Sequence, residues 1–358
     1  MTTIHGKQLD WGIFFSISIL ATGSLLSLAS TNTTLFYRQI FWYVGIFLLI
    51  FFGRKIHWQW LGGQGWFRHG LYWGGVGLLV LTYLQGITIR GTRSWLVIGG
   101  FQFEPVEIVK IGLLFILAHF FSRRHISASQ TKNIFLSLFY TAIPAGLVII
   151  QPDFGSTLII VGIWIGFLFV SGIQKKRLLL GFVMAILLFV LLWTSFLKPY
   201  QKDRLTAFVF PEKDPFGINY NVIQSKIAIG SAGFFGKGFG LGTQSQLRFL
   251  PEAQTDFIFA AFVEEWGFLG GLFLICAFFF LLYRLIQIGL RIGDNYSKFF
   301  ILGAIIIFTL QFFINVGSDL GIMPVTGITF PFFSYGGSSL LTVGLLISII
   351  EHIKFESR

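Results

Sequence analysis

Long apolar runs separated by short polar segments dominate this chain. A membrane-spanning helix needs about 20 mostly apolar residues. The runs predict ten spanning helices, near residues 11–30, 38–53, 69–86, 104–121, 134–150, 155–171, 178–197, 257–283, 298–318 and 331–351. The long polar interruption, residues 198–256, predicts a large loop between the seventh and eighth helices. The pattern therefore predicts an all-α polytopic membrane protein with one integral membrane domain over residues 1–358.

The composition agrees with a membrane protein and excludes an ordinary soluble domain. Of the 358 residues, 54% are hydrophobic and 11% are charged, whereas a soluble domain carries about 25% charged residues. The formal net charge of +11 would suggest nucleic acid as a partner in a soluble protein. Here basic cytoplasmic loops account for the excess, because membrane proteins place Lys and Arg on that side. No nucleic-acid partner is therefore expected.

The distribution of Lys and Arg over the short loops predicts how the chain is oriented in the membrane. With the N-terminus inside, the inner face holds Lys7, Arg54, Lys55, Arg68, Arg123, Arg124, Lys132, Lys175, Lys176, Arg177, Arg284, Arg291, Lys298, Lys354 and Arg358. The outer short loops hold only Arg38, Arg90 and Arg93. This bias predicts that both termini are cytoplasmic and that loop 198–256 is extracytoplasmic. Most acidic residues fall on the outer face, so the chemistry is expected there, where ATP and nucleotide sugars are not available.

Asp256 lies at the seam between the polar loop and the eighth apolar run, directly after Thr255. One interpretation is a helix N-cap, which Asp suits, and the helix dipole favours a negative charge there. The alternative is a carboxylate at the membrane surface that acts as a general base. Glu264 and Glu265 follow inside the apolar run. Acids within a membrane segment are costly, so both are also functional candidates.

Three further charged residues lie within or between apolar runs. Glu107 and Lys110 are three residues apart, so they share one face of the fourth helix. They form either a buried structural ion pair or part of a polar cavity that orients a ligand. Asp153 lies in the turn sequence QPDFGS, where it either bonds its own backbone or faces a pore or a metal ion.

Two irregular segments and the histidines complete the candidates. The glycine-rich run at 229–242 contains Lys237 and is either a flexible loop or a cradle for phosphate. Its spacing does not match a Walker loop. Residues 324–339 are rich in helix breakers and hydroxyls, and they predict a re-entrant turn or a cavity wall. The six histidines are scattered, and no Cys/His metal set or Ser-His-Asp set is evident from the sequence.

Six segments resemble the SEDS family (shape, elongation, division and sporulation), and they are closest to its rod-shape members. They read GTRSWLVIGGFQFEPVEIVK at 91–110, QPDFGST at 151–157, YQKDR at 200–204, NYNVIQSKIAIGSAG at 219–233, GKGFGLGTQSQLRFLPEAQTDFIFAAFVEEWGFLG at 236–270 and GIMPVTGITFPFFSYGGSS at 321–339. The resemblance covers nearly the whole chain, residues 10–352. Two positions depart from the family pattern. Glu-Pro-Val-Glu at 104–107 replaces Gln-Pro-Ser-Glu, and a serine separates Arg93 from Trp95.

The resemblance implies a fold of ten helices with a large extracytoplasmic loop, in the bacterial cytoplasmic membrane. It implies a peptidoglycan glycosyltransferase that polymerises lipid II into glycan strands during cell elongation. The implied partner is a class B penicillin-binding protein, which crosslinks the strands within the elongation complex. The catalytic aspartate of the family follows the threonine of a Thr-Asp-Phe motif, which is Asp256 here.

On this hypothesis Asp256 deprotonates the 4-hydroxyl of the acceptor sugar, and that oxygen attacks the anomeric carbon of the donor. The candidate cations for the pyrophosphate leaving group are Arg93, Lys110, Arg204 and Lys237. Trp95, Glu107, Asp153, Glu252 and Ser338 lie in or beside the matching segments as further candidate substrate contacts. No cofactor is assigned. A divalent cation, Mg²⁺ or Mn²⁺, could share the work with Asp153 or Glu107 nearby.

Two other classes of protein remain open. A flippase that moves lipid II across the membrane would show similar spans and intramembrane charges. A transporter should continue its polar groups to the cytoplasmic side, whereas the intramembrane acids here cluster toward the outer half. A non-catalytic scaffold for a cell-wall complex would need neither Asp256 nor the glycine-rich run.

Overall fold

The computed structural model describes residues 9–89, 92–99, 101–124, 130–174 and 219–356, with only scattered positions between 175 and 218. Its helices are α1 (Trp11–Thr31), α2 (Thr33–Gly53), α3 (Trp58–Gly63), α4 (Gly65–Gln85), α5 (Val106–Arg124), α6 (Thr131–Ile150), α7 (Phe154–Val170), α10 (Tyr220–Ser231), α11 (Thr243–Gln246), α12 (Ile258–Arg291), α13 (Asn295–Asp319) and α14 (Gly337–Glu356). Its strands are β1 (Ile87–Ile89), β2 (Thr92–Ile98) and β3 (Phe101–Phe103).

The predicted membrane class is confirmed. Nine predicted spans coincide with long helices of the described part, namely α1, α2, α4, α5, α6, α7, α12, α13 and α14. The remaining predicted span, 178–197, lies largely outside the described residues, so the count of ten stays a prediction. By length and composition, the described part has six helices apolar enough to cross a membrane: α1, α2, α6, α12, α13 and α14.

The last helix begins later than the hydropathy predicts. Residues 331–336 are apolar enough to extend the span, but the structure starts α14 at Gly337. Phe332 has a positive φ of 59°, which no helix accommodates, and the side chains of Phe330, Phe332 and Phe333 are buried. Residues 330–334 are therefore irregular backbone enclosed by protein, and residues 335 and 336 line the cavity near α10; both are settings in which such backbone is tolerated at membrane depth.

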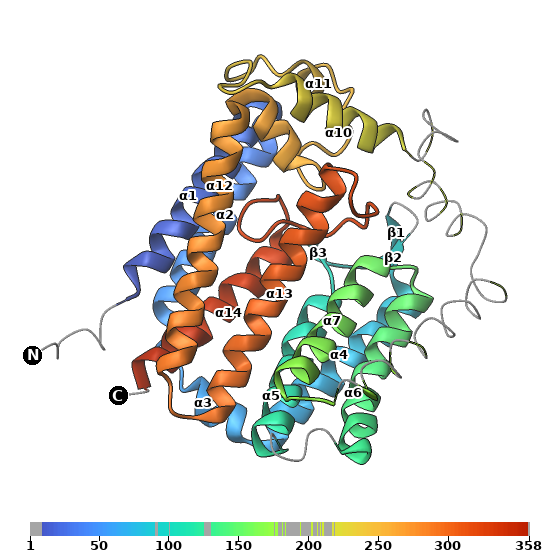
Figure 1. Cartoon of the computed structure of the whole chain (residues 1–358), viewed down its shortest axis with the longest axis vertical. Helices are drawn as coiled ribbons and strands as arrows, with labels where there is room; N and C mark the ends of the chain where they lie inside the picture. Colours follow the sequence, from blue (N-terminus) through green and yellow to red (C-terminus); the bar gives the residue numbers. More distant parts are fainter. Residues whose placement is uncertain are drawn as a thin grey trace, which may run out of the picture.

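The helices pack as two groups joined by α13 (Figure 1). In one group α1 packs on α12 and α2 on α14; in the other α4 packs on α5 and α6 on α7. Helix α13 contacts α5 and α7 on one side and α12 on the other. Aromatic rings fill this junction, where Phe278 and Phe312 stack with centroids 4.6 Å apart. The two groups thus share one aromatic core.

A three-stranded antiparallel sheet lies between α4 and α5, in a segment that the hydropathy pattern leaves unassigned. Ile87 pairs with Trp95, and Leu96 pairs with Phe103. The strands are short and lie beside a long apolar run, so a window long enough to detect a spanning helix hides their alternation. The sheet holds Trp95 at one edge of the cavity described below.

The two ends of the molecule carry different elements (Figure 1). Helices α10 and α11 form one end, and α3 and the last turn of α14 lie toward the other. Near that second end, the Asp10 carboxylate caps α1 by accepting from the Gly12 amide at 3.1 Å. It also accepts from Arg284 at 2.7 Å and from Lys354 at 3.2 Å. Burial acts to raise the pKa of Asp10, but these two cations hold it below its usual value.

Candidate active site

A cavity of about 1070 Å³ opens toward the α10 end of the molecule. Its walls come from the sheet, from helices α2, α5, α7, α10 and α13, from the residues just before α12, and from the segment 321–339. A volume of this size can take a drug-sized or larger polar ligand. Six of the predicted site residues line it: Asp256, Trp95, Glu107, Lys110, Asp153 and Ser338.

Asp256 is not the N-cap of α12. That position belongs to Phe257, which makes no side-chain capping bond. The third amide of the helix, that of Ala260, instead donates to Oδ2 of Asp319 at 3.0 Å. Asp319 is the last residue of α13, so a carboxylate distant in sequence satisfies the helix start. The N-cap interpretation of Asp256 is therefore wrong.

Asn315 fixes the backbone around Asp256. Its Nδ2 donates to the carbonyl of Asp256 at 3.0 Å and to the carbonyl of Ile328 at 2.9 Å. These two bonds tie the start of α12 to the irregular segment before α14. The half-buried Asp256 and its neighbour Thr255 are thereby placed on the cavity wall.

Glu107 and Lys110 form the predicted buried ion pair and also line the cavity. Lys110 Nζ is 2.8 Å from Glu107 Oε1, and both side chains are buried in α5. Both residues also line the cavity. Oε2 of Glu107 has no hydrogen-bond partner within the described part of the chain. A buried polar atom beside a cavity is available to a ligand that can donate a hydrogen bond.

Asp153 has two roles as well. Its Oδ1 accepts from the Ser156 amide at 3.0 Å and so caps α7. It also lines the cavity with only 7% of its surface exposed. Burial raises the pKa of Asp153 above its usual value, although the hydrogen bonds from Ser156 and the charge of Lys110 oppose this.

Three predicted site residues are described outside the cavity lining. Arg93 donates to the carbonyls of Gly86 at 2.8 Å and Leu84 at 2.9 Å, at the C-terminus of α4, where a cation stabilises the helix dipole. The Glu252 carboxylate accepts from the Thr255 hydroxyl at 3.2 Å. Lys237 pairs with Glu264 at 2.8 Å. A fourth predicted residue, Arg204, lies outside the described residues.

Two basic residues on the cavity wall were not among the candidate cations. Arg38 comes from α2 and Lys226 from α10. The sequence contained a signal for each. Arg38 is one of the three basic residues in the predicted outer short loops, and Lys226 lies in the matching segment 219–233. Together with Lys110, they give the cavity cations at both its rim and its interior.

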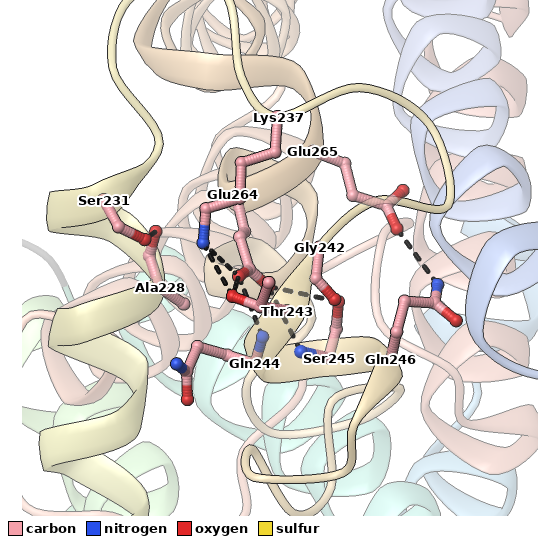
Figure 2. A network of polar contacts seen from close by, with 10 residues as sticks. All are labelled: Ala228, Ser231, Lys237, Gly242, Thr243, Gln244, Ser245, Gln246, Glu264 and Glu265. Atoms are coloured by element: carbon pink, nitrogen blue, oxygen red, sulfur yellow. Dashed lines mark hydrogen bonds and ion pairs between the residues drawn. The ribbon is translucent and has the colours of Figure 1, made fainter.

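Glu264 organises the loop around α11 (Figure 2). Its carboxylate accepts from Lys237 Nζ, from the Thr243 and Ser245 hydroxyls, and from the amides of Gln244 and Ser245, at 2.8–3.1 Å. A buried carboxylate with this many donors is satisfied. The intramembrane acid that the sequence marks as functional therefore holds a loop, and Lys237 belongs to that network.

The same loop repairs a break in α12. Gly267 has φ 73° and ψ −175°, which interrupts the helix. The loop amides of Lys237 and Gly238 donate to the carbonyls of Glu264 and Glu265, both at 3.0 Å. In return, the amides of Phe268 and Leu269 donate to loop carbonyls at 3.0 and 3.1 Å. The broken helical bonds are thus replaced, as a break near membrane depth requires.

The cavity acids Glu104, Glu107 and Asp153 do not form a compact metal cluster. Such a cluster has three His, Cys, Asp or Glu side chains whose ligand atoms all lie within 4.8 Å of one another. Within the described ranges, the group that meets this condition is His57, His352 and Glu356, which does not line the cavity. Among the described residues of this wall, the predicted divalent cation therefore has no ready-made set of three ligands.

Comparison with known proteins places the chain among cell-wall proteins. The family model FtsW/RodA/SpoVE, described as cell cycle protein, matches residues 2–358. Peptidoglycan glycosyltransferase MrdB of Escherichia coli K12 is 37% identical over 285 residues, which cover 78% of this chain and 77% of that protein. Stage V sporulation protein E of Bacillus subtilis has the same identity, 37% over 285 residues, with the same coverage of 78% and 77%.

Solved structures show the same fold. A chain in a structure concerning the coordination of polymerization and crosslinking by a peptidoglycan synthase complex matches with a TM-score of 0.83 at 33% identity. The match covers 96% of this chain and 97% of that one. The rod shape determining protein RodA of Thermus thermophilus matches with a TM-score of 0.72 at 28% identity, covering 97% of each chain.

Proposed function

This chain belongs to the FtsW/RodA/SpoVE family of cell cycle proteins, and we propose that it is a peptidoglycan glycosyltransferase, as its relative MrdB is named. It polymerises lipid II into glycan strands during cell elongation, in the bacterial cytoplasmic membrane. The observation that carries this proposal is Asp256 on the wall of a large cavity, with the capping of α12 left to Asp319. A carboxylate in that place suits proton abstraction from a bound sugar.

Asp256 acts as the general base. It removes the proton from the 4-hydroxyl of the acceptor sugar, and that oxygen attacks the anomeric carbon of the donor. The bond from that carbon to the pyrophosphate oxygen breaks on the opposite face. The leaving group is undecaprenyl pyrophosphate, and the anomeric configuration inverts. The fixed backbone of Asp256, held by Asn315, keeps the base in position, which is where much of the rate gain of such a step originates.

The cations of the cavity stabilise the leaving group. Arg38 and Lys226 line the cavity from two different helices, and Lys110 lies deeper on α5. Charge develops on the pyrophosphate oxygens as the bond breaks, and fixed cations stabilise that charge in the transition state. Trp95 from the sheet and Ser338 from α14 are the proposed contacts for the sugars.

The proposed orientation places the cavity on the extracytoplasmic side and both termini in the cytoplasm. The excess of Lys and Arg in the loops on the other side supports it. A class B penicillin-binding protein is the proposed partner. The similarity to a chain of a peptidoglycan synthase complex concerned with polymerization and crosslinking supports such a pairing.

A polymerisation assay tests the function against its alternatives. The purified protein is given lipid II in detergent, with and without the partner transpeptidase, and glycan length is read on a gel. We expect polymer from the parent protein. A flippase or a scaffold would give none, because detergent offers no membrane to cross and neither class joins sugars.

A further inference from the structure

Two histidines and a glutamate form a cluster at the end of the molecule opposite α10 and α11. His352 and Glu356 lie in the last turns of α14, and His57 lies in the turn before α3. His57 Nδ1 is 2.8 Å from Oε1 of Glu356, and His352 Nε2 is 3.1 Å from its Oε2. Over the described ranges, these are the three side chains of metal-ligating type whose ligand atoms lie within 4.8 Å of one another.

The hydrogen bonding of His352 fixes its tautomer. Its Nδ1 lies 2.8 Å from the carbonyl oxygen of Arg54. A carbonyl only accepts, so Nδ1 carries the proton, and Nε2 of the neutral ring carries a lone pair. The side chain is 2% exposed, and this Nε2 makes no hydrogen bond within the described structure. A buried lone pair 3.1 Å from a carboxylate oxygen is unfavourable unless either a proton on Nε2 or a metal ion neutralises the contact, and the binding experiment below distinguishes the two.

We propose that His57, His352 and Glu356 form a binding site for a transition-metal ion of the Zn²⁺ class. Zinc binds imidazole nitrogen and carboxylate oxygen, and sites with three protein ligands keep a water as the fourth. A metal-binding histidine usually donates its second N–H to a carbonyl or carboxylate. His352 makes this arrangement with Arg54.

The sources of the three ligands suit a metal site. His352 and Glu356 are four residues apart on one helix, so they face the same side. His57 is 74% exposed and can adjust its ring when the ion enters. The ion would join the last turn of α14 to the α2–α3 turn, far from the cavity, and it would stabilise the fold by mass action rather than take part in glycosyl transfer. On the proposed orientation the site faces the cytoplasm.

Metal binding is measured on the full chain without an affinity tag, purified in detergent and stripped with a chelator. The protein is titrated with CoCl₂ and then with ZnCl₂. We expect one Co²⁺ per chain with the visible absorption of a tetrahedral nitrogen and oxygen site, and displacement of that absorption by Zn²⁺. We also expect Zn²⁺ to raise the melting temperature of the parent protein.

Three variants assign the site. His352→Asn keeps a donor for the Arg54 carbonyl but removes Nε2, and Glu356→Gln keeps the shape but removes the charge. His57→Ala changes an exposed side chain and should not impair folding. Each should weaken Zn²⁺ binding at least about tenfold, since even outer-shell changes cost that much. The matched control is His69→Ala, because His69 is an exposed histidine on α4, outside the cluster. This variant should bind Zn²⁺ as tightly as the parent protein does.

Two results would overturn the proposal. One is the absence of saturable binding of Zn²⁺ and Co²⁺ by the parent protein, which would leave the cluster as ion pairs alone. The other is binding by His57→Ala or His352→Asn that equals the parent's. Neither result bears on the polymerisation assay, so failure here is distinguishable from failure of the proposed function.

Discussion

Asp319 at the end of α13 caps α12, and Asp256, for which the sequence allowed two roles, helix cap and general base, does not. Asp319 accepts from the Ala260 amide at 3.0 Å and caps the helix, and Asp256 lines the cavity. Loss of the helix cap, which lowers stability, and loss of the proposed base, which lowers activity, therefore follow from substitutions at different residues. Each can be tested by its own substitution and its own measurement.

The first prediction concerns Asp256. Asp256→Asn should lower polymerisation by roughly 10²–10⁴-fold, the usual contribution of a general base. Its melting temperature should equal the parent's, because the cap is elsewhere. Asp319→Ala is the contrasting variant, and it should lose about 0.5–2 kcal/mol of stability. A near-parental polymerisation rate for Asp256→Asn, in the same detergent assay, would refute the catalytic role.

The second prediction concerns the ion pair of α5. Glu107→Gln leaves Lys110 buried without its counter-charge, and breaking such a pair costs about 3–5 kcal/mol. We expect a low melting temperature and low yield. The double variant Glu107→Gln/Lys110→Met removes both charges and should recover most of the stability. If it also recovered polymerisation, the pair would be structural only. We expect it to stay inactive, because both residues line the cavity.

At the scale of elements, the loop 233–246 and the broken helix α12 form one unit. Loop amides replace the helical hydrogen bonds that Gly267 interrupts. The Glu264 carboxylate accepts hydrogen bonds from the amides of Gln244 and Ser245 in α11. Gly236 has φ 82°, and a Cβ there would collide with the carbonyl of Glu265. The glycine is required by this close approach as well as by its backbone angle.

The third prediction follows from that contact. Gly236→Ala should lower stability by more than about 1 kcal/mol, since alanine fits neither the angle nor the space. Gly230→Ala is the matched control, because nothing lies within 4 Å of its added methyl group and it sits in helix α10. Melting temperature and proteolysis of the loop are the measurements. Equal stability of the two variants would show that the loop does not depend on this approach.

The fourth prediction is a pH dependence at Asp10, which joins α1 to α12 and α14. The pKa of Asp10 is lowered, so its pairing with Arg284 and Lys354 contributes stability above the unfolded pKa of about 3.9. That contribution is lost as the pH falls through the lower folded pKa. Asp10→Asn should therefore melt at a lower temperature than the parent at pH 7, and the gap should close in strong acid. A gap independent of pH would contradict this.

At the scale of the whole molecule, α10 and α11 form one end, α3 and the end of α14 lie toward the other, and the long apolar helices lie between them (Figure 1). The cavity opens beside α10, and the His57, His352 and Glu356 cluster lies at the other end. The basic residues of the short loops set the proposed orientation. The proposed substrate and the proposed metal ion would then reach the protein from opposite sides of the membrane.

The fifth prediction tests this orientation. In a Cys276→Ala background, cysteines are introduced at Lys132, which is exposed at the start of α6, and at Phe235, which is 83% exposed. A membrane-impermeant thiol reagent applied to intact cells should label the cysteine at 235 and not the one at 132. After permeabilisation both should react. Labelling of position 132 from outside would reverse the proposed topology.

The hydropathy of the chain was sufficient to predict the membrane class and most of the spans. A lipid-spanning helix is a local property, since about 20 consecutive apolar residues are sufficient for it. The matching segments also selected Asp256, Glu107, Lys110 and Asp153, which the fold brings to one cavity. Hydropathy did not predict the short strands at 87–103 or the late start of α14. Windows as long as a membrane span average over turns and short alternations.

Contacts between residues distant in the sequence could not be predicted from local patterns, because they depend on how the helices pack. Asp319 lies 59 residues from the amide it caps, and His352 bonds a carbonyl 298 residues away. Glu264 became the anchor of a loop, and Arg38 and Lys226 became cavity cations, through packing that no local pattern encodes. Two of the scattered histidines, His57 and His352, converge for the same reason. Hydropathy specifies that a segment enters the membrane, but the partner of each polar group is decided by which helices pack together.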